Sequence, residues 1–428
     1  MFFLYRILTN ILYPFLIIFI YFRVLKKKED SIRFKEKIFS SHFNVKKKSS
    51  SKLIWFHAAS VGEFKSIIPI IKSLKEEKDN YEFLITTTTI SSSNLVNSEF
   101  KFCDNIHHRF FPIDIYFLVK KFILRWEPEK LFLVDSEIWP NLLLCCKKKK
   151  IPVAILNTRI TKTTFQKWML FPNTSKKIFN LISLFLLSNT KTGEYLSKFE
   201  VKKNIYNLGN LKLINFLNNK KLQNINENLL LKSKFWVAAS THEGEENFCI
   251  DTHFKIKKEH NDIITIIAPR HIHRAKKLKK LCKKANLKYQ ILNENESIQK
   301  NIDIVIINSY GVLNSYFKYC KSVFIGKSLL KSLKNSSGQN PIEAAYLGCR
   351  IYHGPYVDNF EEIYQVLESN KISQKVLNSD FLAKSIIDDL QDKRKIEKNN
   401  SNVISNLGQK TFTDTMKIIN SFILNENK

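Results

Sequence analysis

Features that would indicate a metal site or a disulfide framework are missing from this sequence. The seven cysteines lie at positions 103, 145, 146, 249, 282, 320 and 349; no pair has the spacing of a metal knuckle, and their number is odd. Scattered free thiols in a reducing compartment fit this pattern best. The ten histidines form no HExxH motif, and the i, i+2 pair His271 and His273 is weak support for a ligand set. The sequence therefore predicts no metal site.

The glycine-rich fingerprints of nucleotide-binding proteins are also absent. Glycine and proline number ten each among 428 residues, and neither a GxGxxG nor a Walker GxxxxGK[ST] motif occurs. These absences exclude the usual dinucleotide-binding proteins and P-loop ATPases, whereas a protein that binds a nucleotide sugar is not excluded. The chain also lacks RRM, zinc-finger and helix-turn-helix signatures.

Positive charge, by contrast, is abundant. Lysine and arginine number 69 against 39 acids, which gives a formal net charge of +30 and a pI near 9.7. Such a field favours anionic partners, namely nucleic acid, anionic lipid or a phosphorylated substrate. A biased base composition explains part of the excess equally well, because lysine, asparagine, isoleucine and phenylalanine dominate the chain.

A long apolar run lies near the N-terminus. Ile7 to Phe22 is almost wholly apolar and is flanked by Arg6 and Arg23, with lysines following at 26–28. The run is somewhat shorter than the ~20 residues that span a bilayer as a helix. A secretory signal would carry its charge before the run and small residues after it, and neither holds well. We interpret residues 1–25 as an uncleaved membrane anchor, shallow or tilted, with the basic body on the cytoplasmic side; a buried helix is the alternative.

From Lys52 onward, strand-like and helix-like segments alternate. Short apolar runs such as KLIWFHAAS, YEFLITTTT and KLFLVDSE are each followed by a helix-like segment. Such runs are typical of buried parallel strands, and their alternation with helices predicts doubly wound α/β domains. A polar stretch near residue 220 separates two such series. We predict a basic connector at 26–51, an N-terminal Rossmann-like domain at 52–220 and a similar C-terminal domain at 221–428, which ends in helices, with a cleft between the two.

Acidic residues follow two predicted strands of the first domain, at the edge where open parallel sheets bind ligands. Glu63 lies in the first turn of a helix, whose N-terminus favours the ionised carboxylate. It is a candidate proton acceptor, and simple pairing with the helix dipole is the alternative. Asp135 and Glu137 follow the other strand, where helix capping by Asp135 or Ser136 competes with a catalytic role.

The second domain offers three segments of the same kind. Ser240-Thr241-His242-Glu243 has the spacing of a capping box and predicts a helix start with further acids behind it. Pro269-Arg270 follows a strand; arginine suits a bidentate grip on phosphate or carboxylate, and a solvated basic face is the alternative. Asn340, Pro341 and Glu343 predict a helix start, with Asn340 as cap and Pro341 at N1, that suits a phosphate and a ribose.

Taken together, these segments resemble one family. HAASVGE, TTTT, DSEIWPN, NTRIT, GNLK, ASTHEGEE, PRH and NPIEAAYLG occur in the order seen in 3-deoxy-D-manno-octulosonic acid (Kdo) transferases, behind a hydrophobic N-terminal segment. The resemblance implies a GT-B fold of two Rossmann-like domains that face a cleft, and an inverting sugar transfer that needs no metal or other cofactor. It also implies CMP-Kdo as donor and, as acceptor, the phosphorylated, acylated glucosamine disaccharide that precedes lipid A. The reaction, a step of lipopolysaccharide biosynthesis, would take place at the cytoplasmic face of the inner membrane.

The functional residues of the family carry over onto matching positions. Glu63 matches the proton acceptor, and Glu137 and Lys212 match residues linked to stabilisation of the transition state. The CMP-binding segments match three stretches of the C-terminal domain: Pro269-Arg270, Tyr310-Gly311-Val312 and Asn340-Pro341-Ile342-Glu343. Arg270 would hold the phosphate or the Kdo carboxylate, and Glu343 would accept from the ribose.

The chain departs from the family pattern in the nucleotide half. Val312 stands where Glu is common, Lys327 replaces a Gly, and Ser337-Gly338-Gln339 replaces Gly-Gly-His. Two other interpretations therefore remain beside the Kdo transferase. One keeps the fold and exchanges the donor for another CMP-activated sugar acid. The other is a basic, membrane-tethered nucleic-acid-binding protein, which the charge favours; the Kdo transferase itself predicts no nucleic-acid partner.

Overall fold

The protein is described here from a computed structural model, which covers residues 2–45, 51–78, 80–202, 204–217, 223–332, 337–392 and 398–424. The chain divides into two compact units: unit 1 comprises Met1–Asn215 and Gly408–Lys428, and unit 2 comprises Phe216–Leu407. The join expected at residue 220 lies outside the described residues. The division differs from the expected one at the other end of the chain, because the residues from Gly408 onward belong with unit 1.

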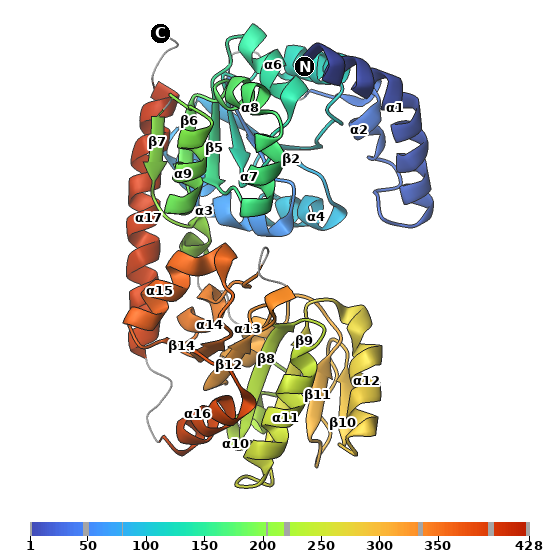
Figure 1. The fold of residues 1–428 in the computed structure, drawn as a ribbon. Helices are drawn as coiled ribbons and strands as arrows, with labels where there is room; N and C mark the ends of the chain where they lie inside the picture. The colour runs from blue at the N-terminus through green and yellow to red at the C-terminus, as the bar shows by residue number, and fades with distance from the viewer. Residues whose placement is uncertain are drawn as a thin grey trace. The chain divides into compact units, whose positions relative to one another are not determined.

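Unit 1 is built on a parallel sheet of seven strands in the order β3-β2-β1-β4-β5-β6-β7 (Figure 1). The strands are β1 (Lys52–His57), β2 (Tyr81–Thr87), β3 (Ile106–Phe110), β4 (Lys130–Val134), β5 (Val153–Thr158), β6 (Leu184–Leu187) and β7 (Asn204–Asn207). Successive side chains of a strand point to opposite faces of the sheet. Ile54 and Phe56 therefore enter one core, and Leu53 and Trp55 enter the other.

Helices cover both faces of this sheet, which explains why its strands are apolar throughout. One face carries α3 (Val61–Glu77), α4 (Ile90–Glu99) and the C-terminal helix α17 (Lys398–Leu424). The other face carries α5 (Tyr116–Trp126), α6 (Pro140–Lys148), α8 (Pro172–Phe179) and α9 (Thr190–Lys198), and α7 (Lys162–Met169) precedes α8.

The C-terminal helix is part of the core of unit 1. Met416, Ile419 and Ile423 of α17 are buried among the side chains of α3 and the sheet. At Gly408 the helix approaches the 3-10 segment η2 (Leu211–Leu217) so closely that a Cβ there would lie 2.6 Å from the carbonyl oxygen of Leu213. This contact over a long sequence separation places the end of the chain in unit 1, and no local sequence pattern encodes it.

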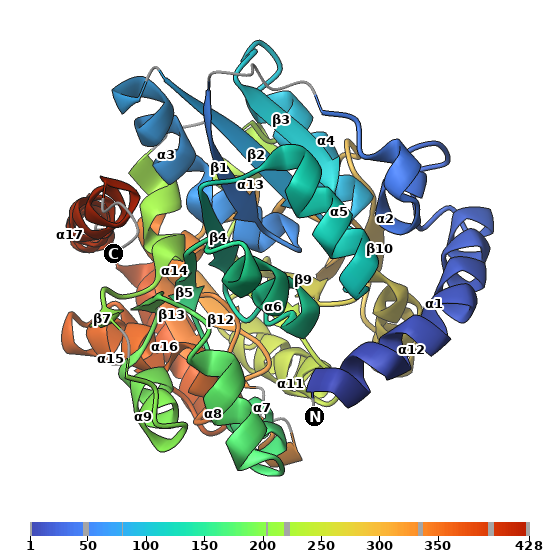
Figure 2. The same ribbon diagram turned by 90° about the horizontal axis from the view of Figure 1, so that it is seen from above.

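The N-terminal apolar segment forms one helix, α1 (Phe2–Leu25), in unit 1. By length and composition alone, its residues Phe3–Leu25 are long and apolar enough to cross a membrane. The predicted connector holds the short helix α2 (Lys35–Ile38) and a 3-10 turn, η1 (Ser40–His42). In Figures 1 and 2, α1 starts beside α6 and ends near α2.

Unit 2 repeats the architecture with the strand order β10-β11-β9-β8-β12-β13-β14, again parallel. Its strands are β8 (Phe235–Thr241), β9 (Ile264–Pro269), β10 (Tyr289–Leu292), β11 (Ile304–Ile307), β12 (Ser322–Ile325), β13 (Arg350–His353) and β14 (Ser373–Lys375). Its helices are α10 (Glu227–Lys232), α11 (Glu245–Lys257), α12 (Ala275–Lys284), α13 (Leu313–Phe317), α14 (Ile342–Tyr346), α15 (Glu361–Ser369) and α16 (Ser379–Gln391). The structure thus confirms the predicted pair of doubly wound α/β domains.

Candidate active site

The strand order of unit 1 changes direction between β1 and β4. β1 pairs in parallel with β2 on one side and with β4 on the other, and the chain leaves β1 and β4 toward opposite faces of the sheet. Ligands of open α/β sheets bind beyond the carboxyl ends of the strands at such a switch point. Glu63 follows β1, and Asp135 and Glu137 follow β4. The structure therefore brings together the three acids that the sequence singled out in this domain.

The carboxylate of Glu63 is fixed by the turn that starts α3. Ser60 is the N-cap residue, and its hydroxyl oxygen accepts a hydrogen bond from the backbone N–H of Glu63 at 3.3 Å. The same hydroxyl donates to Oε1 of Glu63 at 2.8 Å, and the backbone N–H of Ala59 donates to Oε2 at 2.7 Å. Both oxygens are thus oriented by the strand-to-helix turn. This arrangement is a close variant of a capping box, so the helix-start explanation and a chemical role coexist in one residue.

The pKa of Glu63 is raised from its ordinary value, whereas the helix N-terminus had been expected to favour the ionised form. Burial is the largest cause of the raised pKa, and the hydrogen bond from Ser60 opposes it. The charges of Glu137 and Asp135 raise the pKa further, while the N–H of Ala59 lowers it. A carboxylate whose pKa lies nearer to neutral is a better general base than an ordinary surface glutamate.

Glu137 has two aromatic neighbours, of which Trp139 forms a hydrogen bond with it. The indole Nε1–H of Trp139 donates to its Oε2 at 2.8 Å, and Nε2 of the fully buried His57 lies 3.6 Å from the same oxygen. His57 is itself positioned by Thr86, whose hydroxyl lies 3.0 Å from Nδ1, and by Phe111, whose ring stacks on the imidazole with the centroids 4.1 Å apart. The sequence suggested Glu137, but it gave no sign that His57 supports it.

Asp135 does not cap the helix that follows it, in contrast to the alternative considered from the sequence. It adopts a left-handed conformation with φ 63°, and its Oδ1 lies 3.6 Å from Nε of Arg159. The start of α6 is capped instead by the buried Asp114, which accepts from the backbone N–H groups of Asn141 and Leu142 at 3.0 and 2.9 Å. Asp135 is thus available to the cluster of acids and not to the helix.

Lys212 lies in η2, close behind the end of β7. The backbone N–H of Leu211 donates to Oδ1 of Asn157, a buried residue in β5, at 2.9 Å. The N–H of Lys212 donates to Oδ1 of Asn210 at 3.0 Å. The bond from Leu211 ties the Lys212 segment to β5, the strand beside β4, so the predicted stabilising lysine belongs to the same end of the sheet as Glu137.

The predicted donor-binding residues of unit 2 lie at the end of a strand of its sheet or in the segments that follow one. Pro269 ends β9, and the exposed Arg270 comes next, with its N–H donating to the carbonyl of Thr241 at 3.0 Å. Tyr310, Gly311 and Val312 follow β11, where Tyr310 is exposed and Gly311 has φ 81°.

The third segment, 340–343, follows β12. Asn340 Oδ1 accepts from the N–H of Ile342 at 3.1 Å, but α14 begins at Ile342 and its N-cap residue is Pro341. Asn340 is therefore not the N-cap and Pro341 is not the N1 residue, so both predicted positions are wrong by one residue. All three segments therefore lie at the carboxyl edge of one sheet.

The capping box expected at Ser240–Glu243 does not form. α11 begins at Glu245, and Gly244, with φ 94°, precedes it. Glu243 is exposed and pairs with Arg274 and Lys277, each at 3.1 Å. The first turn of α11 instead carries two buried acids, Glu245 and Glu246, whose burial the sequence did not indicate.

Glu245 is fully buried and accepts four backbone hydrogen bonds. Oε1 accepts from the N–H groups of Ser328 and Leu329 at 2.9 and 3.0 Å, and Oε2 accepts from those of His242 and Lys327 at 2.9 and 2.7 Å. β8 and β12 are neighbours at the switch point of this sheet. One carboxylate therefore joins the two turns that follow β8 and β12 at the carboxyl edge of the sheet of unit 2.

Two further features make this junction tight. The neighbouring buried acid, Glu246, accepts from Nε and Nη2 of Arg274 at 2.8 and 3.0 Å, a bidentate pair. At Gly326 a Cβ would lie 2.6 Å from the carbonyl oxygen of Ser240, so only glycine fits. The next residue, Lys327, holds φ 57°, a conformation that suits the glycine it replaces.

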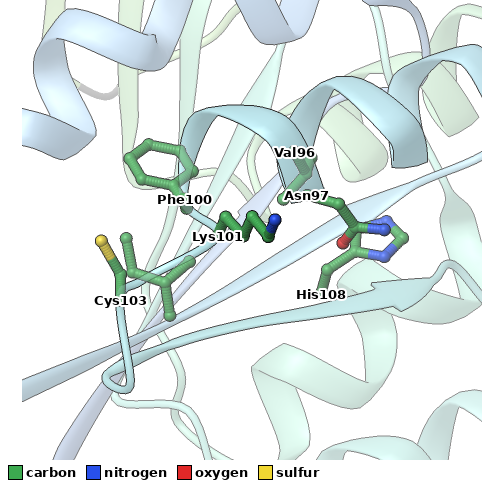
Figure 3. Close-up of a pocket in the computed structure, with 7 residues that line it drawn as sticks. Val96, Asn97, Phe100, Lys101, Cys103 and His108 are labelled. Carbon is green, nitrogen blue, oxygen red and sulfur yellow. The ribbon is translucent and has the colours of Figure 1, made fainter.

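A cavity of about 330 Å³ lies elsewhere in unit 1, between α4 and β3 (Figure 3). Its lining consists of Val96, Asn97, Phe100, Lys101, Cys103, Ile106 and His108. It contains none of the predicted site residues and sits at the edge strand, so we do not assign the reaction to it. Over the described part of the chain, no group of three or more His, Cys, Asp or Glu residues is arranged to hold a metal ion.

Comparisons with known proteins agree with this architecture. Residues 33–215 match the family model described as 3-deoxy-D-manno-octulosonic-acid transferase (kdotransferase). The chain is 26% identical to the probable 3-deoxy-D-manno-octulosonic acid transferase, mitochondrial, of Arabidopsis thaliana, covering 98% of this chain and 95% of that protein. It is also 26% identical to the 3-deoxy-D-manno-octulosonic acid transferase of Haemophilus influenzae, with 73% of each chain covered. Among solved structures, a glycosyltransferase from Rickettsia africae shares the fold, with a TM-score of 0.59 at 12% identity over 88% of this chain and all of that one.

Two parallel α/β units with an acidic cluster at one switch point, together with these likenesses, define a glycosyltransferase of the GT-B type. Along residues 33–215 and over most of the length of these relatives, the chain is similar to the Kdo transferases.

Proposed function

We propose that the protein transfers Kdo from CMP-Kdo to the phosphorylated, acylated glucosamine disaccharide that precedes lipid A, with inversion at the anomeric carbon. The similarity to Kdo transferases supports the sugar and the transfer. The structural observation that carries the proposal is the Glu63 carboxylate. Its two oxygens are oriented by Ala59 and Ser60, and its pKa is raised by burial and by the acids that follow β4.

In this mechanism Glu63 takes the proton of the acceptor hydroxyl while that oxygen bonds to the anomeric carbon of Kdo. The bond between this carbon and the phosphate oxygen breaks, and CMP leaves with the electron pair. Glu137 stabilises the oxocarbenium character of the anomeric carbon, and the ammonium group of Lys212 balances the charge of the departing phosphate. The raised pKa of Glu63 suits proton transfer near neutral pH.

The donor would be held by the carboxyl edge of the sheet in unit 2. Arg270, exposed at the end of β9, has the geometry to grip the phosphate or the Kdo carboxylate. Tyr310-Gly311-Val312 and Asn340-Pro341-Ile342-Glu343 would complete the CMP site, with Glu343 accepting from the ribose. Glu245 does not touch the donor in this scheme; it holds in place the two turns that flank these segments.

The acceptor is a lipid, so the proposal places the protein at the cytoplasmic face of the inner membrane. The apolar helix α1 and the net charge of +30 support association with an anionic surface. Near such a surface each Lys or Arg contributes on the order of 1 kcal/mol.

The test is the variant Glu63→Gln, assayed as the purified full chain with CMP-Kdo and the lipid A precursor, with the product identified by mass spectrometry. Loss of a general base lowers turnover by about 10²- to 10⁴-fold. Glu76→Gln, which changes an exposed acid of the same helix, is the matched control and should keep wild-type turnover. Unchanged turnover of Glu63→Gln, with circular dichroism and melting temperature intact, would exclude Glu63 as the base. Competition by other CMP-activated sugar acids tests the choice of donor separately.

A further inference from the structure

Helix α1 is docked on unit 1 along its length through one face. In its first half, Tyr5, Thr9 and Tyr13 follow one another at i, i+4 spacing and so share a face. The Tyr5 hydroxyl donates to Asp114 at 3.0 Å, Nδ2 of Asn141 donates to the Thr9 hydroxyl at 3.3 Å, and the Tyr13 hydroxyl donates to the carbonyl of Ile38. Three polar groups of this largely apolar helix therefore have hydrogen-bond partners in the globular part.

The second half of α1 continues the same contact. Ile20 is buried against Phe34 and Ile38, and the Tyr21 ring meets Phe34 edge to face with centroids 5.0 Å apart. Nε of Arg23 pairs with Glu29 at 2.7 Å, and Glu29 also accepts from Lys37. From Tyr5 to Arg23 the helix rises by roughly 27 Å at 1.5 Å per residue, close to the thickness of a bilayer core.

The opposite face of α1 is open to solvent and almost wholly apolar, with the exposed Asn10 at its margin. Its exposed apolar side chains are Leu4, Ile7, Leu8, Ile11, Phe15, Ile18, Phe22 and Leu25. An exposed apolar stripe of this length marks a surface that is covered in the working protein.

The border of this stripe is positively charged, which indicates what covers it. Phe117 of α5 packs edge to face on Tyr13, is itself 38% exposed, and extends the stripe sideways. The next turn of α5 presents the exposed Lys120 and Lys121, and lysines at 26–28 follow the end of α1. An apolar stripe with a basic border is complementary to an anionic lipid surface.

We propose that α1 is an in-plane membrane helix: it stays docked on unit 1 and inserts its outer face into one anionic leaflet, without crossing the bilayer. If α1 crossed the bilayer while docked on unit 1, the residues of unit 1 that contact it would lie at the same depth in the membrane. Phe117 touches Tyr13 in the middle of α1, so Lys120 and Lys121 would then lie near the centre of the bilayer, where a charged side chain is strongly disfavoured. In the plane of the membrane, these lysines sit at the level of the headgroups instead.

This inference rests on the membrane location of the proposed function but not on its donor or acceptor, and the first experiment tests topology. The full chain carries one epitope tag at each terminus and is expressed in a bacterial inner membrane from which inverted vesicles are prepared. We expect external protease to remove both tags. A protected N-terminal tag beside a digested C-terminal tag would mean that α1 crosses the bilayer and would overturn the proposal.

The second experiment tests the outer face with purified protein and vesicles of phosphatidylglycerol and phosphatidylcholine, without any sugar nucleotide. Ile11→Glu, in the centre of the stripe, should lower vesicle binding about tenfold or more. Leu231→Glu, which changes an exposed leucine of unit 2, should leave binding unchanged. The idea fails if Ile11→Glu binds as well as the wild type, or if it turns a dimer in lipid-free buffer into a monomer, because a second copy would then cover the face. A protein that binds vesicles as expected but transfers no Kdo would count against the proposed function alone.

Discussion

The variant Glu245→Gln tests whether one buried carboxylate joins the turns after β8 and β12. Each oxygen of Glu245 accepts two backbone N–H groups, from His242 and Lys327 on one side and from Ser328 and Leu329 on the other. Glutamine keeps the size of the side chain, but one oxygen becomes an NH₂ group, which donates. Two buried N–H groups then lose their acceptor and face another donor.

The cost follows from the number of unpaired groups. A buried donor without an acceptor costs about 1–3 kcal/mol, so two of them destabilise unit 2 by about 2–6 kcal/mol. For a domain of 150–250 residues each kcal/mol lowers the melting temperature by roughly 2–4 °C. We therefore expect the melting transition of unit 2 to fall by roughly 4–24 °C.

Differential scanning calorimetry of the full chain measures this shift, and Glu259→Gln provides the control. Glu259 is exposed just beyond the end of α11, so its amide variant should melt within about 1 °C of the wild type. A Glu245→Gln protein that also melts at the wild-type temperature would refute the four-acceptor geometry. If the variant melts early but binds CMP normally at low temperature, the carboxylate supports the fold and not the ligand directly.

Three further variants test other parts of the structure. His57→Asn removes the imidazole beside Glu137 and should lower kcat by about 10- to 100-fold with little change in KM for CMP-Kdo; an unchanged kcat would remove His57 from the site. Gly326→Ala places a Cβ 2.6 Å from a backbone oxygen and should cost several kcal/mol in urea unfolding, whereas Gly62→Ala, whose nearest contact is 4.0 Å away, should not. Burial lowers the pKa of His108 from 6.5 to about 3, so the neutral ring stabilises the fold fully above pH 6.5, and this contribution is lost as pH falls toward 3. His108→Gln should therefore flatten the acid slope of the unfolding free energy by up to about 1.4 kcal/mol per pH unit, and equal slopes in the two proteins would contradict the assignment.

The sequence predicted the fold class and much of the acidic cluster because both follow from local patterns. Apolar runs such as KLIWFHAAS and KLFLVDSE indicate parallel strands, and chemistry at a parallel sheet is expected just after its strands. Glu63 and Glu137 could be selected on this basis. The direction of the pKa shift of Glu63 could not be predicted from the sequence. The effect of the helix dipole follows from the local sequence, whereas burial and the approach of Asp135 and Glu137 depend on the tertiary structure.

The misplaced elements share the same cause. The capping box expected at Ser240–Glu243 has suitable spacing, but α11 begins instead at Glu245. Glu245 accepts hydrogen bonds from four N–H groups, and some of these belong to a turn more than 80 residues later, which no local pattern predicts. Strand β3 was not anticipated because its sequence, IHHRF, is polar. As the edge strand of its sheet, it is less enclosed than its neighbours and tolerates such residues.

The return of α17 to unit 1 has a consequence for synthesis of the protein on the ribosome. The whole of unit 2 is translated between the two segments of unit 1, so unit 2 is complete in the nascent chain before Met416, Ile419 and Ile423 emerge. Until then, the face of the first sheet that carries α3 lacks part of its cover. A premature stop near residue 407 would therefore damage the half of the protein made first, although it removes only the residues made last.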